Sequence, residues 1–184
     1  MDAPDTALEA AVTQTGRSLA ELSRASPLLV VFLRHGGCPF CRESLADVAA
    51  KRTAIEGSGV TIVLVHLMSD EQARELFARY GLDDVPRISD PDRRLYAAFE
   101  LQRGGVGDVI GPRVWWRGFQ TAILSGHLFG KPAGDVFQLP GAFLLVDGRI
   151  VRAHRGRTSA DVPNLDDLTS CPLPAPQDVR HVDS

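Results

Sequence analysis

Hydrophobic and polar positions follow two different periods along the chain. Residues 28–33 (LLVVFL) and 60–67 (VTIVLVHL) are short, nearly continuous apolar runs, a pattern typical of strands buried on both faces of a sheet. Over residues 39–55 and 70–80, apolar positions instead recur every three to four residues, which indicates amphipathic helices. The order strand, helix, strand, helix predicts a βαβ unit.

The ends of these helices carry signals of their own. Pro39 suits a first helical turn, where its missing N–H costs no hydrogen bond, and Gly57 indicates the end of that helix. Ser69 and Gln72 have the spacing of a capping box, and Gly81 follows as a stop signal for the second helix.

The second half of the chain predicts the rest of the sheet. Residues 87–89 are expected to form a short strand, and residues 114–124 a helix. Residues 142–146 and 150–154 flank Asp147-Gly148-Arg149, which is a strong hairpin signal. Together these elements predict an α/β thioredoxin-like fold, with a central mixed β-sheet flanked by helices on both faces and a C-terminal β-hairpin.

The length predicts one domain with two flanking segments. A chain of 184 residues is long enough for a single core. Residues 1–26, which include helix-forming stretches at 7–13 and 19–24, are expected to be an N-terminal helical extension. Residues 27–160 are expected to form the thioredoxin-like redox domain, and residues 161–184 a polar, proline-containing tail.

Composition and charge narrow the set of partners. The chain is 44% hydrophobic and 23% charged, with a net charge of −3, and it has no dense basic patch of the kind that nucleic acid attracts. Its longest apolar runs are too short to cross a bilayer, and its acidic N-terminus lacks a basic-then-apolar signal segment. We therefore expect a cytoplasmic protein that binds neither nucleic acid nor membranes.

Cys38-Pro39-Phe40-Cys41 is the motif that indicates chemistry, because it follows a predicted strand and opens a predicted helix. Two thiols three positions apart on a first helical turn are close enough to form a disulfide. The unpaired N–H groups of the helix start stabilise a thiolate, and such settings lower a cysteine pKa from about 8.5 to about 3.5–7.5. The pattern predicts a redox-active dithiol with Cys38 and Cys41 as the catalytic residues.

The position of each cysteine in the motif and the residues around it suggest which one is the nucleophile and which one resolves the intermediate. As the first of the pair, Cys38 is expected to be the more exposed thiol and the nucleophile, with Arg34 nearby, while Cys41 resolves the intermediate. Structural zinc is the competing chemistry, but it commonly needs four ligands. The chain offers one close pair and a distant Cys171, which we interpret as a tail thiol, so we expect no metal.

Four segments resemble a known family, in the right order over residues 17–162. They are FLRHGGCPFCRESLADVA, SDPDRRLYAAFEL, WRGFQTAILSGHLFGKPAGD and FQLPGAFLLVDGRIVRAHRGRTSAD. The first resembles the active-site region of the peroxiredoxin-like AhpC/TSA family, a group related to the selenoprotein SelL within the thioredoxin-fold superfamily. This resemblance implies a thioredoxin fold and thiol-based redox activity.

The resemblance also implies a second assignment of roles. The peroxidatic cysteine of peroxiredoxins aligns with the second cysteine of a CxxC motif, so Cys41 would react with peroxide and Cys38 would resolve it; both assignments stay open. Most peroxiredoxins carry Thr or Ser three positions before that cysteine, where this chain has Cys38, or His35 when counting from Cys38. The proline that faces a thioredoxin active site falls near Pro140.

We therefore expect a thiol-dependent oxidoreductase that reduces hydroperoxides or protein disulfides. No nicotinamide or flavin fingerprint is present in the sequence, so we expect no cofactor and a thioredoxin- or glutathione-type thiol as electron donor. A homodimer is compatible with this interpretation. The alternative hypothesis is a redox-sensing interaction module, whose disulfide switches a surface near residues 115–119 without turnover.

Overall fold

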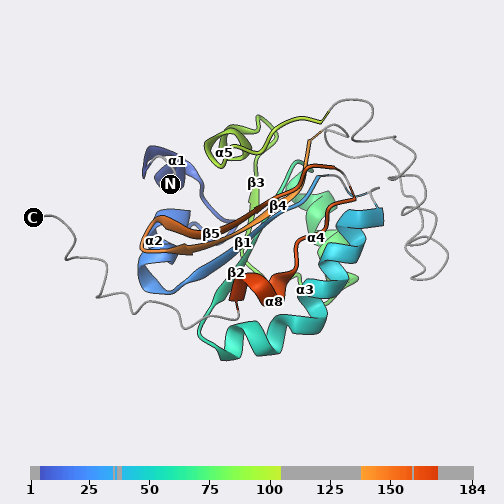
Figure 1. Ribbon diagram of the computed structural model, residues 1–184, viewed down its shortest axis with the longest axis horizontal. Coiled ribbons are helices and arrows are strands. Elements are labelled where there is room, and N and C mark those ends of the chain that lie inside the picture. The colour runs from blue at the N-terminus through green and yellow to red at the C-terminus, as the bar shows by residue number, and fades with distance from the viewer. Residues whose placement is uncertain (1–4, 35, 37–38, 105–137, 159, 170–184) are drawn as a thin grey trace, which may run out of the picture.

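The computed structural model describes residues 5–34, 36, 39–104, 138–158 and 160–169 (Figure 1). Its centre is a five-stranded mixed sheet in the order β3-β2-β1-β4-β5. The strands are β1 (Leu28–Phe32), β2 (Thr61–His66), β3 (Arg87–Ser89), β4 (Gly141–Val146) and β5 (Arg149–Arg155). β1, β2 and β3 are parallel, whereas β4 runs antiparallel to both β1 and β5. The predicted mixed sheet with a C-terminal hairpin is confirmed.

Helices cover both faces of this sheet. One face carries α3 (Pro39–Gly57), α4 (Asp70–Ala78) and α8 (Leu165–Thr169), and the other carries α1 (Asp5–Ala10), α2 (Leu19–Ala25) and α5 (Arg94–Ala98). Figure 1 shows the two groups on opposite sides of the strands. The expected three-layer α/β arrangement is therefore the one observed.

The two central strands are buried on both sides, as their apolar runs predict. Along β1, Leu29 and Val31 belong to the core under α3, while Val30 and Phe32 belong to the core under α5. All four side chains are at most 1% exposed. Burial of one such side chain contributes about 1.5–3 kcal/mol to the stability of the fold. Because β1 contributes buried side chains to both cores, it links them.

Local signals place the element ends where the sequence predicts them. Ser69 and Gln72 form a complete capping box at the start of α4. In the hairpin, Asp147 and Gly148 have φ angles of +48° and +77° between the paired residues Val146 and Arg149. Two positive φ angles are what a tight two-residue turn requires. The helix predicted over residues 114–124 lies outside the described residues.

The segments that flank the predicted redox domain pack against its sheet. In α1 and α2, Leu8 and Leu19 are buried in the core under α5. In α8, Leu165 and Leu168 are buried in the core under α3, although the sequence predicts only a polar tail from residue 161. The boundaries at residues 26 and 160 stay predictions. Among the described residues, none of the helices combines the length and apolar character that a membrane span needs.

Candidate active site at the start of helix α3

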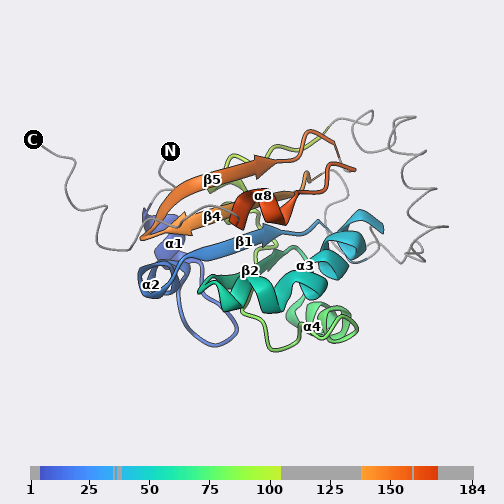
Figure 2. The same cartoon turned by 60° about the horizontal axis from the view of Figure 1, so that its bottom comes forward.

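The site is built where the central strand ends. Sheet pairing of β1 stops at Phe32 on both sides, opposite Val65 of β2 and Gly141 of β4. The chain then turns and enters α3 at Pro39. In Figure 2 the arrowhead of β1 and the first turn of α3 lie at the same end of the molecule. A side chain on this turn therefore faces peptide groups that the sheet leaves unpaired.

Cys41 occupies this position. It is the third residue of α3 and is 4% exposed, within the core on the α3 face. The backbone N–H of Arg34 donates a hydrogen bond to Cys41 Sγ at 3.3 Å. A donor aimed at sulfur favours the charged thiolate, and the N-terminus of a helix acts in the same direction. These two effects favour the thiolate of Cys41, whereas burial of its side chain in the core acts against it.

A small cavity adjoins the sulfur. Its volume is about 10 Å³, and its lining comes from the end of β1, the first turns of α3 and two loops, with Phe32, Phe40, Cys41, Pro140 and Val162 among its residues. A cavity of that volume has room for about one water molecule. Pro140 thus lines the same cavity as Cys41, in the region where the sequence predicts a proline facing the cysteine motif.

Tyr96 of α5 reaches the same strand end from the opposite face. Its side chain is 0% exposed and packs edge-on against Phe32, with ring centroids 4.9 Å apart. The hydroxyl donates to the carbonyl oxygen of Leu33 and lies 3.3 Å from that of Val65. Burial raises the pKa of Tyr96 well above its ordinary value, and negative charge on Cys41 raises it further. The hydroxyl is therefore a proton donor throughout the physiological pH range.

Asp90 fixes the helix that carries Tyr96. This carboxylate is 8% exposed and accepts the backbone N–H groups of Arg94, Leu95 and Tyr96 at 3.0, 2.8 and 3.2 Å. Burial raises the pKa of Asp90, while the same N–H groups act to lower it. The carboxylate thereby supplies the first turn of α5 with the acceptor that a helix start needs.

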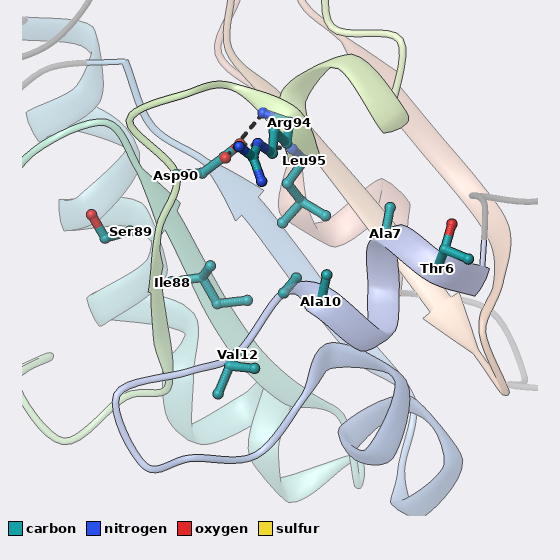
Figure 3. Close-up of a pocket in the computed structure, with 10 residues that line it drawn as sticks. Thr6, Ala7, Ala10, Val12, Ile88, Ser89, Asp90, Arg94 and Leu95 are labelled. Carbon is teal, nitrogen blue, oxygen red and sulfur yellow. Dashed lines mark hydrogen bonds between the residues drawn. The ribbon is translucent and has the colours of Figure 1, made fainter.

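A second, larger cavity lies beside Asp90. It has a volume of about 400 Å³ and is lined from α1, β3 and α5. Figure 3 shows Asp90 hydrogen-bonded to Arg94 at one end of this cavity, with the small side chains Ala7 and Ala10 at the other. The two cavities share no lining residue. In the cavity beside Asp90, the Asp90 carboxylate binds backbone N–H groups, the Arg94 side chain pairs with Asp92, and none of the described lining residues is a cysteine. We therefore assign the thiol chemistry to the cavity at Cys41.

Three of the other residues that the sequence analysis considers, Cys38, His35 and Cys171, lie outside the described residues, as do His127, Trp115 and Trp116. His154 is partly exposed, lies 3.4 Å from Asp161 and does not line the Cys41 cavity. His66 is a buried core histidine, and its Nδ1 makes a 3.1 Å hydrogen bond to the carbonyl oxygen of Met68.

Sequence reasoning missed Tyr96 and Asp90 as members of this site. Both lie in the segment SDPDRRLYAAFEL, which served only as a family match. One signal was available, because a tyrosine on the apolar face of a helix needs a hydrogen-bond partner for its hydroxyl when it is buried. The partner itself is 63 residues away in the chain, so no local pattern identifies it.

Gly156 holds Pro140 against the Cys41 cavity. Its N–H donates to the carbonyl oxygen of Pro140 at 2.9 Å, and a Cβ atom at this position would lie 2.8 Å from that oxygen and 2.9 Å from Pro140 Cγ. We expect Gly156→Ala to lower the free energy of unfolding by about 1–3 kcal/mol in urea denaturation, because overpacking forces Pro140 to shift. The matched control is Gly57→Ala at the end of α3, where an added Cβ meets nothing within 4 Å. Equal stability of the two variants would contradict the expectation.

Comparison with known proteins gives the family. Residues 45–158 match the family described as AhpC/TSA antioxidant enzyme. The peroxiredoxin-like 2A proteins of Rattus norvegicus and Homo sapiens are 26% and 25% identical over 152 residues, which cover 79% of this chain and 62% of theirs. The chain thus spans about three fifths of the length of these curated relatives.

Solved structures agree on the fold. The bacterioferritin comigratory protein of Xanthomonas campestris superimposes with a TM-score of 0.62 at 17% identity, covering 92% of each chain. PrxQ of Xylella fastidiosa gives a TM-score of 0.62 at 16% identity, covering 91% of this chain and 89% of the other. At these identities the likeness shows the thioredoxin-type fold. With more than half of its residues matching the family, the chain belongs to the AhpC/TSA antioxidant enzyme family and is a peroxiredoxin-like thioredoxin-fold protein.

Proposed function

We propose that this protein is a thiol peroxidase in which Cys41 is the peroxide-reactive residue and Cys38 resolves it. The observation that carries the proposal is the 3.3 Å hydrogen bond from the Arg34 amide to Cys41 Sγ, on the first turn of α3 and beside a cavity. Membership of an antioxidant enzyme family supports it. The Xanthomonas campestris structure is described in terms of alkyl peroxide reduction activity, which is the same class of reaction.

The chemistry needs no group beyond two thiols and a donor. The thiolate of Cys41 attacks the terminal oxygen of a hydroperoxide, so an S–O bond forms while the O–O bond breaks. The leaving alkoxide or hydroxide takes up a proton, and Cys41 becomes a sulfenic acid. The thiolate of Cys38 then attacks that sulfur, so the S–S bond forms while the S–O bond breaks, and the leaving hydroxide takes up a proton to become water. An external thiol of the thioredoxin or glutathione type restores the dithiol by exchange.

Two features favour this order of the cysteines. A peroxide-reactive thiolate needs donors that stabilise it, and Cys41 receives one from Arg34. A cavity with room for about one water molecule also adjoins the Cys41 sulfur. The same dithiol would exchange with protein disulfides, a second substrate class for one site. Since the cycle requires continuous reduction by a thiol pool, we further propose a cytoplasmic setting.

Turnover distinguishes this proposal from a redox sensor. The pre-reduced protein is mixed with hydrogen peroxide and a thioredoxin–thioredoxin reductase system, and consumption of reductant is followed. We expect many equivalents of donor to be consumed per protein, at a rate well above that of a free thiol. Oxidation that stops at one equivalent per protein would support the sensing module instead. Peroxide loss no faster than with free cysteine would sink the peroxidase proposal.

A further inference from the structure

We propose that Tyr96 is a positioning residue for Cys41, acting through the single peptide group that joins Leu33 to Arg34. The Tyr96 hydroxyl donates to the carbonyl oxygen of this peptide, and the N–H of the same peptide donates to Cys41 Sγ. The inference rests on the proposed function, because it concerns how the reactive thiol is held.

The geometry of a peptide group makes this coupling direct. The C=O and N–H of a trans peptide point in opposite directions from one rigid plane. Tyr96 belongs to the core on the α5 face of the sheet, and Cys41 belongs to the core on the α3 face. The Leu33–Arg34 peptide therefore connects groups that approach it from opposite sides. Rotation of the plane weakens both hydrogen bonds together.

This peptide needs an anchor because the sheet no longer supplies one. The paired residues of β1 end at Phe32 on both sides, and the N–H of Leu33 makes the last bond to β2, at 2.8 Å from the carbonyl oxygen of Val65. The next carbonyl group, that of Leu33, accepts from Tyr96 instead of from a strand. Without Tyr96, the carbonyl group of this peptide would lose the hydrogen bond that orients it toward the α5 face.

Tyr96 is itself fixed tightly enough to act as an anchor. Asp90 binds the first N–H groups of α5, including that of Tyr96, and the Tyr96 ring packs against Phe32. The side chain is 0% exposed, so water does not compete for its hydroxyl. The hydrogen bonds that lead from Asp90 through Tyr96 and the Leu33–Arg34 peptide to Cys41 are therefore all made by protein groups held in place.

The physical effect is on the thiolate. A hydrogen bond to a peptide carbonyl polarises the peptide and strengthens the bond that its N–H donates, by about a tenth to a third in condensed phases. A bond from the N–H to the charged sulfur is worth more than a bond to the neutral thiol. The Tyr96 hydroxyl thus favours the thiolate form of Cys41 without touching it.

The test measures the thiol pKa in a protein that retains only one of its three cysteines. In a Cys38→Ser, Cys171→Ser background, the ultraviolet absorbance of the thiolate is followed against pH, after subtraction of a counterpart that also carries Cys41→Ser. We expect Tyr96→Phe to move the midpoint upward by at least about 0.3 of a pH unit. Tyr80→Phe, which removes the only other tyrosine hydroxyl, is the matched control and is expected to leave the midpoint unchanged.

Among the described residues, the ionisable groups at this peptide include Arg34 in the chain itself, Cys41 on the α3 side and Tyr96 on the α5 side, with Asp90 acting on Tyr96. Only Tyr96 differs between the compared proteins. If the Tyr96→Phe variant unfolds along the same curve as its parent and its thiol titrates at the same midpoint, the proposal is overturned. Peroxide takes no part in this readout, so failure of the proposed peroxidase function does not affect it.

A second measurement covers the case in which Tyr96→Phe does not fold. Biosynthetic incorporation of 3-fluorotyrosine into the Tyr80→Phe protein alters Tyr96 alone and makes its hydroxyl a stronger donor at nearly unchanged size. The thiolate midpoint is then expected to move downward, in the direction opposite to that of the phenylalanine variant. An unchanged midpoint in the fluorinated protein would likewise reject the coupling.

Discussion

Cys41→Ser is expected to slow the reaction with hydrogen peroxide by about a thousandfold or more, because a serine hydroxyl is not ionised at neutral pH and is a weak nucleophile. The side chain keeps its shape, and Ser Oγ still accepts the N–H of Arg34, so the variant is expected to fold. The measurement is stopped-flow consumption of peroxide by the pre-reduced protein, with the unfolding curve recorded alongside.

The other two cysteines provide the controls. Cys38→Ser is expected to keep the fast first step and to stop at a sulfenic acid, because the resolving thiol is gone. Cys171→Ser is expected to behave as the unaltered protein in both steps. If Cys41→Ser consumed peroxide at the original rate while Cys38→Ser did not, the assignment of the two roles would have to be exchanged.

Mild acid is expected to destabilise the fold through His66. Burial lowers the pKa of this histidine from 6.5 to about 4, so the unfolded chain binds a proton in a pH range where the folded protein does not. Stability is therefore fully present above about pH 6.5, falls as the pH drops toward 4, and in total loses about 3 kcal/mol. Between neutral pH and about pH 5 the loss is about 2 kcal/mol.

His66→Asn isolates this contribution. The asparagine amide can still donate to the carbonyl oxygen of Met68, as His66 Nδ1 does, but it does not titrate. Urea unfolding of both proteins at several pH values gives two curves, whose difference removes the contribution of the carboxylates. We expect the two curves to converge by about 2 kcal/mol on going from neutral pH to about pH 5. Parallel curves would mean that His66 is protonated equally in both states.

Local patterns predicted most of the sheet. The strands β1 and β2 are recognisable because each is apolar on both faces, and the hairpin is recognisable because Asp147-Gly148 is suited to positive φ angles. Residues 39–41 of the cysteine motif lie at the start of α3, as predicted, because a strand end and a helix start are both local signals. In each case a few neighbouring residues determine the structure.

The rest depends on contacts between distant residues. α8 was predicted as part of a polar tail, since Leu165 and Leu168 are two apolar positions in a polar stretch, and only the sheet beneath them makes them core. The bonds from Tyr96 to Leu33 and from Arg34 to Cys41 are fixed by the ends of β1 and α5. No spacing in the sequence encodes these bonds. The partner of Cys41 within the motif, Cys38, lies outside the described residues.

Trapping of the first oxidised cysteine tests the central claim most directly. Reduced Cys38→Ser protein receives one equivalent of hydrogen peroxide together with a dimedone-type reagent, which adds to sulfenic acids, and the adduct is located by peptide mass spectrometry. The account predicts rapid and nearly complete labelling of Cys41. An unlabelled Cys41, together with rapid labelling of Cys38 in the Cys41→Ser protein, would contradict it.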